Sequence, residues 1–432
     1  MATPSTLNPS HPAGPAIAAR RERIQQAWGL REEIVLIGAG DRILIPGTGD
    51  QTYRFRSHPE YFYLTDQECP GGVLAFDPTE GWIDFVPDVT ERERVWEAGE
   101  QQDGASLALL GAWIGARRAR PLAMLGTELP CLRFDAGRSL ELRTILTHER
   151  RPKDEFELAR IRAAAVATAS GYAAARPSIR PGATEQDVAI ELESGFRRGG
   201  GDGPAYDTIV GSGPNSAVLH FSPGRRVIEE GDLVLIDAAA EVGRYCCDVT
   251  RVFPGGESFD SEAKDLYDLV SLVETHAIAR CLSGAEIVDV HEAATRETTE
   301  GLLNLGFLRG AVDDLIGRGA TDLFLPHGIA HMVGLGVRDA GGSLPGRAPD
   351  ARPGRKLQRM NLPLRPGYVI TIEPGIYFIP PILNDPARRN EYRDVVRWDR
   401  VDPWLRRGGI RIEDTVHVTT GAPEVITSAV PK

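Results

Sequence analysis

The chain has 432 residues, of which 42% are hydrophobic and 25% charged, and its formal net charge at pH 7 is −12. This length favours two domains, because one hydrophobic core rarely grows beyond about 250–300 residues. The negative charge argues against nucleic acid and anionic membranes as partners, since both attract basic surfaces, and no apolar run of about 18 residues predicts a membrane span.

The N-terminal residues 1–18 mix Pro, Ser and Ala with polar residues and lack the apolar core of a signal peptide. We therefore expect a poorly ordered tail and a cytoplasmic protein. Five cysteines without a metal-binding spacing also suit a reducing compartment. We expect them to be buried as small apolar residues: Cys69, Cys131, Cys246, Cys247 and Cys281.

Residues 19–147 alternate short apolar runs with helical stretches, which predicts an α/β domain. We expect strands at 34–37, 61–64 and 72–76, and helices at 91–97 and 106–117. The polar stretch 147–153 is interpreted as the linker, so that a second domain covers residues 148–432.

The second domain begins with a long amphipathic helix, predicted from Asp154 to about Ala174, with Leu158, Ile161 and Ala165 on one face. Further helical patterns would cover a curved sheet. They lie near 185–198, 261–283 and 291–305.

Two aspartates flank a predicted hairpin in this domain. Asp237 closes one apolar run and Asp248 opens another, with a turn expected at 241–244, where Gly243 supplies a positive φ. Centred there, the hairpin makes the two aspartates face each other directly. Side chains so paired lie about 4.5–5.5 Å apart, where like charges are destabilising, so the pair predicts a bound cation. A solvated turn residue is the alternative for either aspartate.

Three more candidate ligands follow in β-prone or loop segments. Glu373 ends a strand-like stretch before Pro374, Glu413 lies in a short β-prone run, and His331 follows His327 by four residues. Oxygen ligands with one histidine favour Mn²⁺, with Zn²⁺ or Co²⁺ tolerated. Four carboxylates neutralise two divalent ions, so a bridging hydroxide can act as the nucleophile. A core histidine and a solvated strand edge are the alternatives.

The segment 205–256, AYDTIVGSGPNSAVLHFSPGRRVIEEGDLVLIDAAAEVGRYCCDVTRVFPGG, resembles the catalytic core of the pita-bread metallopeptidases, which include prolidase and aminopeptidase P. LPHGIAHMVGLG, LRPGYVITIEPGIYF and GGIRIEDTVHVT follow in the family's order, so the resemblance covers about residues 150–425. It implies an α/β (α+β) fold with a pita-bread catalytic domain. FRSHPEYFYLTDQECPGGVLAFDP resembles the smaller N-terminal α/β domain of prolidases and aminopeptidase P, which methionine aminopeptidases lack.

The resemblance also implies a ligand set for two metal ions. In similar enzymes the residues matching Asp248 and Glu413 contact both ions, and the residue matching Glu373 is proposed to carry the proton. The full set falls on Asp237, Asp248, His331, Glu373 and Glu413.

Three further residues match family positions beside the metals. His220 and His327 match histidines that face the substrate, where they can stabilise the tetrahedral intermediate or its leaving nitrogen. Tyr206 matches a tyrosine that supports a metal-binding carboxylate. Satisfied core histidines and a plain aromatic contact are the alternatives.

Three arginines bear on the substrate. Arg359 stands where prolidases carry an arginine that binds the C-terminal carboxylate of the substrate, and Arg411 matches another family arginine near the site. Surface charges or structural ion pairs are the alternatives. Arg338 replaces the histidine of the usual V-H-D triplet. It either adds a positive group for a dipeptide carboxylate, marks an altered pocket, or pairs with Asp339.

The combined hypothesis is a di-metal hydrolase that cleaves Xaa-Pro dipeptides (a prolidase) through a metal-bridging hydroxide. The long segment 379–407 also resembles prolidases. The alternatives are an Xaa-Pro aminopeptidase that acts on longer peptides and a non-catalytic peptide-binding protein of this fold. The expected partners are short proline-containing peptides and a second copy of the chain. The expected cofactors are two divalent ions, with Mn²⁺ preferred over Zn²⁺ or Co²⁺.

Overall fold

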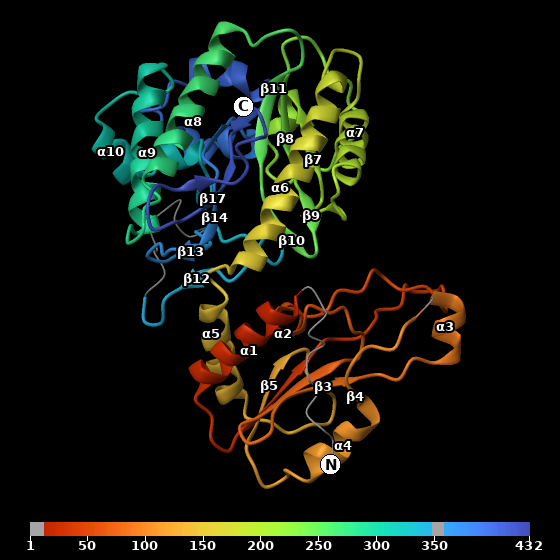
Figure 1. Ribbon diagram of the computed structural model, residues 1–432. Coiled ribbons are helices and arrows are strands. Elements are labelled where there is room, and N and C mark those ends of the chain that lie inside the picture. Colours follow the sequence, from red (N-terminus) through yellow and green to blue (C-terminus); the bar gives the residue numbers. More distant parts are fainter. Residues whose placement is uncertain (1–12, 98, 348–357) are drawn as a thin grey trace. The chain divides into compact units, whose positions relative to one another are not determined.

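The predicted linker at 147–153 spans the point where the chain divides into two units, Met1–Arg150 and Arg151–Lys432. The computed structural model describes residues 13–97, 99–347 and 358–432 (Figure 1). Among the helices in these ranges, none combines the length and the apolar content that a bilayer span requires.

The first unit is built on a five-stranded sheet. Its elements are α1 (Gly14–Trp28), β1 (Ile34–Gly38), α2 (Pro59–Thr65), β2 (Val73–Asp77), β3 (Gly81–Val86), α3 (Glu91–Glu97), β4 (Ala105–Ser106), α4 (Leu110–Gly115), β5 (Leu122–Gly126) and α5 (Ala136–Glu149). The strand order is β4-β3-β2-β1-β5, with β1–β5 and β3–β4 parallel and the other pairs antiparallel. Strands β1 and β2 are buried at every residue, as expected for strands covered on both faces.

The predicted strand at 61–64 is wrong, because these residues lie in the helix α2. Pro59 occupies the first turn of this helix and the His58 side chain accepts a hydrogen bond from the backbone N–H of Glu60. A short apolar run that is buried on all sides has no periodicity that separates a strand from a helix. The local start signals therefore decided the outcome.

Other expectations for this unit hold only in part. Helix α1 includes residues 14–18, which were predicted to belong to a poorly ordered tail, and residues 1–12 of that predicted tail lie outside the described residues. The helix predicted over 106–117 is split into a 3₁₀ turn, Leu107–Leu109, and α4. Cys131 is exposed, whereas the other four cysteines are buried as expected.

The second unit contains several short sheets with helices packed on them. Its helices are α6 (Glu155–Ala175), α7 (Glu185–Arg198), α8 (Ser261–Ala279), α9 (Ile287–Asn304), α10 (Val312–Arg318), α11 (Pro380–Leu383), α12 (Pro386–Glu391) and α13 (Trp398–Val401). Its strands are β6 (Gly203–Pro204), β7 (Ile209–Ser212), β8 (Leu233–Asp237), β9 (Ala240–Val242), β10 (Tyr245–Cys246), β11 (Thr250–Pro254), β12 (Gly342–Ser343), β13 (Met360–Asn361), β14 (Val369–Ile372), β15 (Gly375–Tyr377), β16 (Gly409–Arg411), β17 (Asp414–His417) and β18 (Glu424–Val425).

Antiparallel ladders β11-β8-β7 and β14-β17-β18 carry the segments that matter for function. A bridge between Thr250 and Glu413 joins the two ladders. Helices α6 and α7 pack against each other, and α6 lies on β9 and β10, while α8 contacts α9 and β14–β16 (Figure 1). The ladders therefore meet between two helical layers.

Helix α6 begins with a capping box, in which the Asp154 and Glu157 side chains satisfy each other's backbone N–H groups. Its close approach to α7 depends on Gly171, where a Cβ would lie 2.3 Å from the ring of Phe196. Capping signals also set the start of α7, which the sequence predicted with the same bounds.

The turn between β9 and β10 differs from the predicted one. Val242 pairs with Tyr245, so only Gly243 and Arg244 form the turn, with φ values of 54° and 73°. Positive φ at both residues is the two-residue geometry that fits the twist of paired strands. The hairpin is therefore centred one residue further along the chain than the sequence analysis placed it.

This shift changes the partner of the first aspartate. Asp237 pairs with Thr250 and not with Asp248, so the predicted direct pairing is wrong. A shift of the centre by one residue moves the partner by two, and side chains in strands alternate with a period of two. Asp237 and Asp248 therefore remain on the same face, in diagonal positions.

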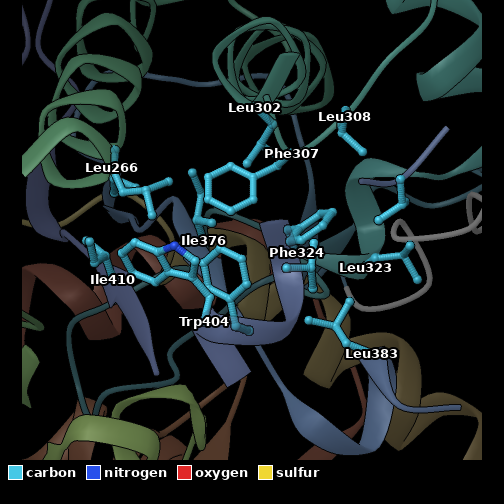
Figure 2. Close-up of a cluster of buried hydrophobic side chains, with 14 of the residues drawn as sticks. Leu266, Leu302, Phe307, Leu308, Leu323, Phe324, Ile376, Leu383, Trp404 and Ile410 are labelled. Atoms are coloured by element: carbon cyan, nitrogen blue, oxygen red, sulfur yellow. The ribbon is translucent and has the colours of Figure 1, made fainter. Parts of the chain in front are cut away.

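A cluster of buried apolar side chains lies against the ladder β11-β8-β7 and the paired strands β15 and β16 (Figure 2). Trp404 stacks on Phe378 with ring centroids 4.9 Å apart, and Phe307 meets both rings. Ile376 of β15 and Ile410 of β16 point into this cluster. Because strand neighbours alternate, the residues that follow them point to the other face.

Candidate active site

The five predicted ligands all come from ends of strands or from the loops that follow them. Glu373 follows β14, and Glu413 lies between β16 and β17. The chain at Met332 bridges to Ile370 of β14, which brings His331 beside this ladder. Strand ends from three ladders thus direct their side chains to one place, and the cleft there is lined by Asp237, Asp248, Glu373 and Glu413.

Tyr206 connects the two aspartates. Its hydroxyl lies 2.8 Å from Asp237 Oδ1 and 2.5 Å from Asp248 Oδ1. Burial raises the pKa of this hydroxyl well above its usual range, and the two carboxylates add to the shift. Tyr206 therefore stays protonated and fixes the carboxylates at a set spacing.

His331 has a defined tautomer. Its Nδ1 lies 3.0 Å from the carbonyl oxygen of Met332, which can only accept, so Nδ1 carries the proton. The lone pair of Nε2 then points to Asp248 Oδ2 at 3.3 Å and to Glu373 Oε1 at 3.7 Å. A backbone contact that orients the ring in this way is typical of metal-binding histidines.

The buried group of Asp248, His331 and Glu413 has the arrangement of a metal centre, with one ligand atom from each residue within 4.8 Å of the others. Within the described residues, His331 Nε2 and Glu413 Oε1 are buried and have no hydrogen-bond partner. Buried polar atoms almost always have a hydrogen-bond partner or another ligand, so these two atoms are suited to bind a metal ion.

The raised pKa values of the carboxyl groups in the cleft indicate a site that suits a cation. Burial raises the pKa of Glu413 well above its usual range, and the neighbouring Asp248 and Glu373 raise it further. Burial also raises the pKa of Asp237 to about 6, with Arg411 opposing the shift. Carboxylates gathered in this way resist ionisation unless a cation joins them, and Mn²⁺ or Zn²⁺ accepts such ligands.

Arg411 was predicted to bind substrate, but its guanidinium is bound within the protein. It is 3% exposed and lies 2.5 Å from Asp237 Oδ2, 2.9 Å from the Tyr377 hydroxyl and 3.0 Å from Thr250 Oγ1. The structure thus favours the alternative of a structural ion pair, in which Arg411 holds Asp237.

The two other candidate histidines, His220 and His327, differ in their exposure and in their hydrogen bonds. His327 uses Nδ1 for the Gly328 carbonyl and Nε2 for the Tyr377 hydroxyl. His220 is exposed to the cleft, and burial together with Arg338 lowers its pKa, so its imidazole is neutral near pH 7. His220 is therefore the histidine better placed to meet a substrate.

The cleft has two hollows, of about 330 and 130 Å³, which share part of their lining. Arg338 and Arg359 line both, and within the described ranges neither makes an ion pair with a carboxylate. Partial burial lowers the pKa of Arg359, and Arg338 lowers it further. The pairing of Arg338 with Asp339 was one of three alternatives, and the structure gives Asp339 a different cation, Lys153 Nζ, at 2.9 Å.

Several residues around the site were missed by the sequence analysis. Thr250 donates to Glu413 Oε2 at 2.6 Å, and Thr415 contacts the backbone N and O of Asp248 at 2.8 Å each. Tyr377 joins Arg411 to His327. The sequence did contain a signal for Thr250, because this residue lies two positions after Asp248 in the strand and therefore on the same face.

Known proteins resemble the whole chain. Residues 159–420 match metallopeptidase family M24. An Aspergillus niger protein named "Probable Xaa-Pro aminopeptidase pepP" is 32% identical, over 95% of this chain and 94% of that protein. The structure of Pseudomonas aeruginosa aminopeptidase PepP has a TM-score of 0.79 at 27% identity, over 97% of this chain and 95% of that one.

Aminopeptidase P of Escherichia coli, solved with the inhibitor Pro-Leu, is 26% identical, with a TM-score of 0.79 over 96% of this chain and 95% of that one. The same enzyme has also been solved in a Zn-substituted form with product. These similarities confirm the predicted α/β fold, with an N-terminal domain before a pita-bread catalytic domain.

Proposed function

The chain belongs to metallopeptidase family M24, and we propose that it is an Xaa-Pro aminopeptidase, which releases the N-terminal residue from peptides with proline in second place. The observation that carries the proposal is the buried group of Asp248, His331 and Glu413 in a chain similar along its length to Xaa-Pro aminopeptidases. The sequence hypothesis ranked a dipeptidase first, and the relatives favour its alternative.

Two divalent ions of the Mn²⁺ or Zn²⁺ type would be held by Asp237, Asp248, His331, Glu373 and Glu413. When bound, such ions polarise a carbonyl oxygen and make water a stronger acid. Tyr206 and Arg411 keep Asp237 in place for this task from two sides.

Glu373 is placed to move the proton. Its side chain is 14% exposed, at the cleft surface, and its Oε2 lies 4.0 Å from His327 Nδ1. The nitrogen of an Xaa-Pro bond carries no hydrogen and must gain a proton to leave as an amine. Glu373 can take a proton from the attacking water and deliver it to that nitrogen, while His220 faces the substrate.

The proposal is tested with tripeptides. Metal-stripped and Mn²⁺-loaded protein are incubated with Ala-Pro-Ala, and with Ala-Ala-Ala as the control peptide, and released alanine is measured by chromatography. We expect release only from Ala-Pro-Ala and only with metal. Bound metal without any cleavage would contradict the proposal and favour the non-catalytic peptide-binding protein.

A second candidate function, an Xaa-Pro dipeptidase, is favoured by Arg338 and Arg359. Burial and the nearby Arg338 guanidinium lower the pKa of Arg359, and an anion between the two guanidiniums would relieve their repulsion. A guanidinium binds both oxygens of a carboxylate. The free carboxylate of a dipeptide has the required chemistry.

Ala-Pro and its amide Ala-Pro-NH₂ separate the two functions. A dipeptidase should prefer Ala-Pro, and Arg359→Ala should raise KM for Ala-Pro with little change in kcat. Arg347→Ala is the matched control. Arg347 forms an ion pair with Glu286, at a distance of 2.7 Å, and neither residue lines the cleft. Equal cleavage of both compounds, with KM unchanged in Arg359→Ala, would remove the dipeptidase.

A further inference from the structure

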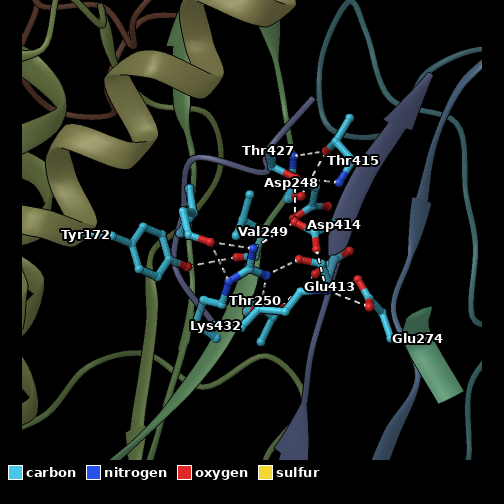
Figure 3. Close-up of polar contacts among 12 residues, drawn as sticks. Tyr172, Asp248, Val249, Thr250, Glu274, Glu413, Asp414, Thr415, Thr427 and Lys432 are labelled. Carbon is cyan, nitrogen blue, oxygen red and sulfur yellow. Dashed lines mark hydrogen bonds and ion pairs between the residues drawn. The ribbon is translucent and has the colours of Figure 1, made fainter. Parts of the chain in front are cut away.

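Asp414 lies beside the metal-binding candidate Glu413 but points to the other side of the strand. Glu413 lines the cleft, and because neighbouring strand residues alternate between faces, Asp414 points away from it. Figure 3 shows Asp414 among the polar side chains that surround it. Asp414 is 1% exposed. Whatever holds its carboxylate therefore also restrains the backbone that presents Glu413.

Three side chains hold the Asp414 carboxylate. Arg251 Nη2 donates to Oδ1 at 2.7 Å and Thr427 Oγ1 donates to the same oxygen at 2.6 Å. Lys432 Nζ lies 3.0 Å from Oδ2. Two of these contacts come from residues 427–432, which we call the 427–432 segment (Figure 3).

Arg251 connects this arrangement to the metal-binding candidates directly. Its Nη1 donates to the backbone carbonyl of Glu413 at 2.7 Å and to that of Thr250 at 3.0 Å. Its Nε and Nη2 donate to the carbonyl of Val430, at 3.1 and 2.8 Å. The buried guanidinium thus joins the 427–432 segment to the backbone at the bridge between the two ladders.

Lys432 also binds Glu274 of α8, with Nζ 2.6 Å from Oε2. Glu274 and Asp414 are both buried. Arg251 and Lys432 are cations in contact with this pair. Burial and the neighbouring Asp414 raise the pKa of Glu274 to about 8, so Glu274 is mostly protonated near pH 7 and Asp414 carries the negative charge of the pair. Loss of Lys432 would remove one cation from the buried Asp414 carboxylate together with the bridge to Glu274, which would allow Asp414 to move.

We propose that Lys432 is a positioning residue for metal binding, which acts through Asp414 on the adjacent Glu413 from the side of the strand opposite the cleft. The inference rests on the metal centre of the proposed function. Contacts that orient metal ligands typically change affinity by about 10–100-fold when they are removed. We expect a decrease of about ten-fold, because Lys432 acts through one intervening residue.

The test compares Lys432→Met, Lys432→Arg and Lys264→Met in the full chain. Lys264 is the matched control, because it pairs with Asp268 at 2.6 Å on the exposed side of the same helix α8. Mn²⁺ affinity is measured by titration calorimetry on metal-stripped protein, and the visible absorption of the Co²⁺-loaded protein reports ligand geometry. Thermal unfolding without metal reports stability alone.

We expect weaker Mn²⁺ binding and an altered Co²⁺ spectrum in Lys432→Met, recovery in Lys432→Arg, and no change in Lys264→Met. Lower stability with unchanged affinity and spectrum would make Lys432 merely structural and overturn the inference. If Lys432→Met does not fold, Thr427→Val tests the same route through Oδ1 of Asp414, with the same two outcomes. Failure of the unaltered protein to bind Mn²⁺ would instead overturn the proposed function.

Discussion

Buried carboxylates occur in both units, but their neighbours differ. In the first unit, Asp84 forms two hydrogen bonds with Arg21, at 2.7 and 2.9 Å. Burial alone would raise the pKa of Asp77, but hydrogen bonds from Arg120 and Arg117 hold it well below its usual range. Each of these carboxylates has at least one arginine for itself.

In the cleft of the second unit, the carboxylates face one another instead. Asp237, Asp248 and Glu413 lie together. Among the described residues, Arg411 is the one arginine that forms an ion pair with this group, through Asp237. Burial accordingly raises the pKa of Glu413 well above its usual range. A buried carboxylate with its own counter-charge is satisfied within the fold, whereas an unbalanced group of carboxylates marks a place for a cation.

The largest effect should come from removing a carboxylate of the unbalanced group. We expect Asp248→Ala to lose bound metal and to lower kcat/KM by at least about 10³-fold, near 4 kcal/mol, because metal activation supplies several kcal/mol. Metal content is measured by mass spectrometry and activity with Ala-Pro-Ala. Asp268→Ala, on the exposed side of α8, is the control. Full activity in Asp248→Ala would refute the metal assignment.

The balanced group should respond in stability rather than in metal binding. Asp84→Ala leaves the buried Arg21 without its counter-charge, which should cost about 3 kcal/mol of unfolding free energy. Urea unfolding measures the loss, and calorimetry should show unchanged Mn²⁺ affinity. The double variant Arg21→Met with Asp84→Leu should recover most of the stability. A loss of metal binding in Asp84→Ala would break the comparison.

Metal itself should stabilise the second unit. At free Mn²⁺ about 100 times its dissociation constant, the unfolding free energy should rise by about 2.7 kcal/mol, because only the folded state offers the centre. Thermal unfolding at increasing Mn²⁺ measures this gain. The gain should persist in Asp84→Ala and disappear in Asp248→Ala. The same gain in both variants would place the ion elsewhere.

A smaller effect is expected from the tyrosine that joins the two aspartates. Tyr206→Phe removes a hydroxyl in contact with Asp237 and Asp248 and should weaken Mn²⁺ binding about ten-fold, near 1.4 kcal/mol. Tyr172→Phe is the matched control, because that buried hydroxyl contacts the backbone and not a carboxylate: it lies 2.9 Å from the carbonyl oxygen of Val249 and 3.2 Å from that of Ile236. Equal affinities in the two variants would show that Tyr206 does not orient ligands.

Much of the local structure could be predicted from the sequence. The helices α3 and α7 have the predicted bounds, and α6 differs by one residue at each end. Capping residues and periodicity are local signals, so they can be read without a fold. The run at 61–64 gave no such signal, because it is buried on every side.

The candidate ligands were also predicted from the sequence. Four of them close, open or lie within strand-like runs, His331 lies in a loop segment, and the resemblance to the pita-bread metallopeptidases named all five as one set. The partners of the arginines around these ligands could not be predicted from the sequence. Arg411 and Arg338 are both arginines near the cleft, yet the first is bound by Asp237 and the second lines the hollows. The difference depends on partners more than 100 residues away in the chain, since Arg411 meets Asp237 across 174 positions.

The sequence by itself determined the residue types, the strand ends that carry them and the limits of the capped helices. Only the tertiary structure decided the register of the hairpin, where the φ values of Gly243 and Arg244 moved the partner of Asp237 by two residues. It also decided that Asp414 faces the 427–432 segment. Local preferences act along the chain, whereas register and charge balance depend on which distant side chains share a buried space.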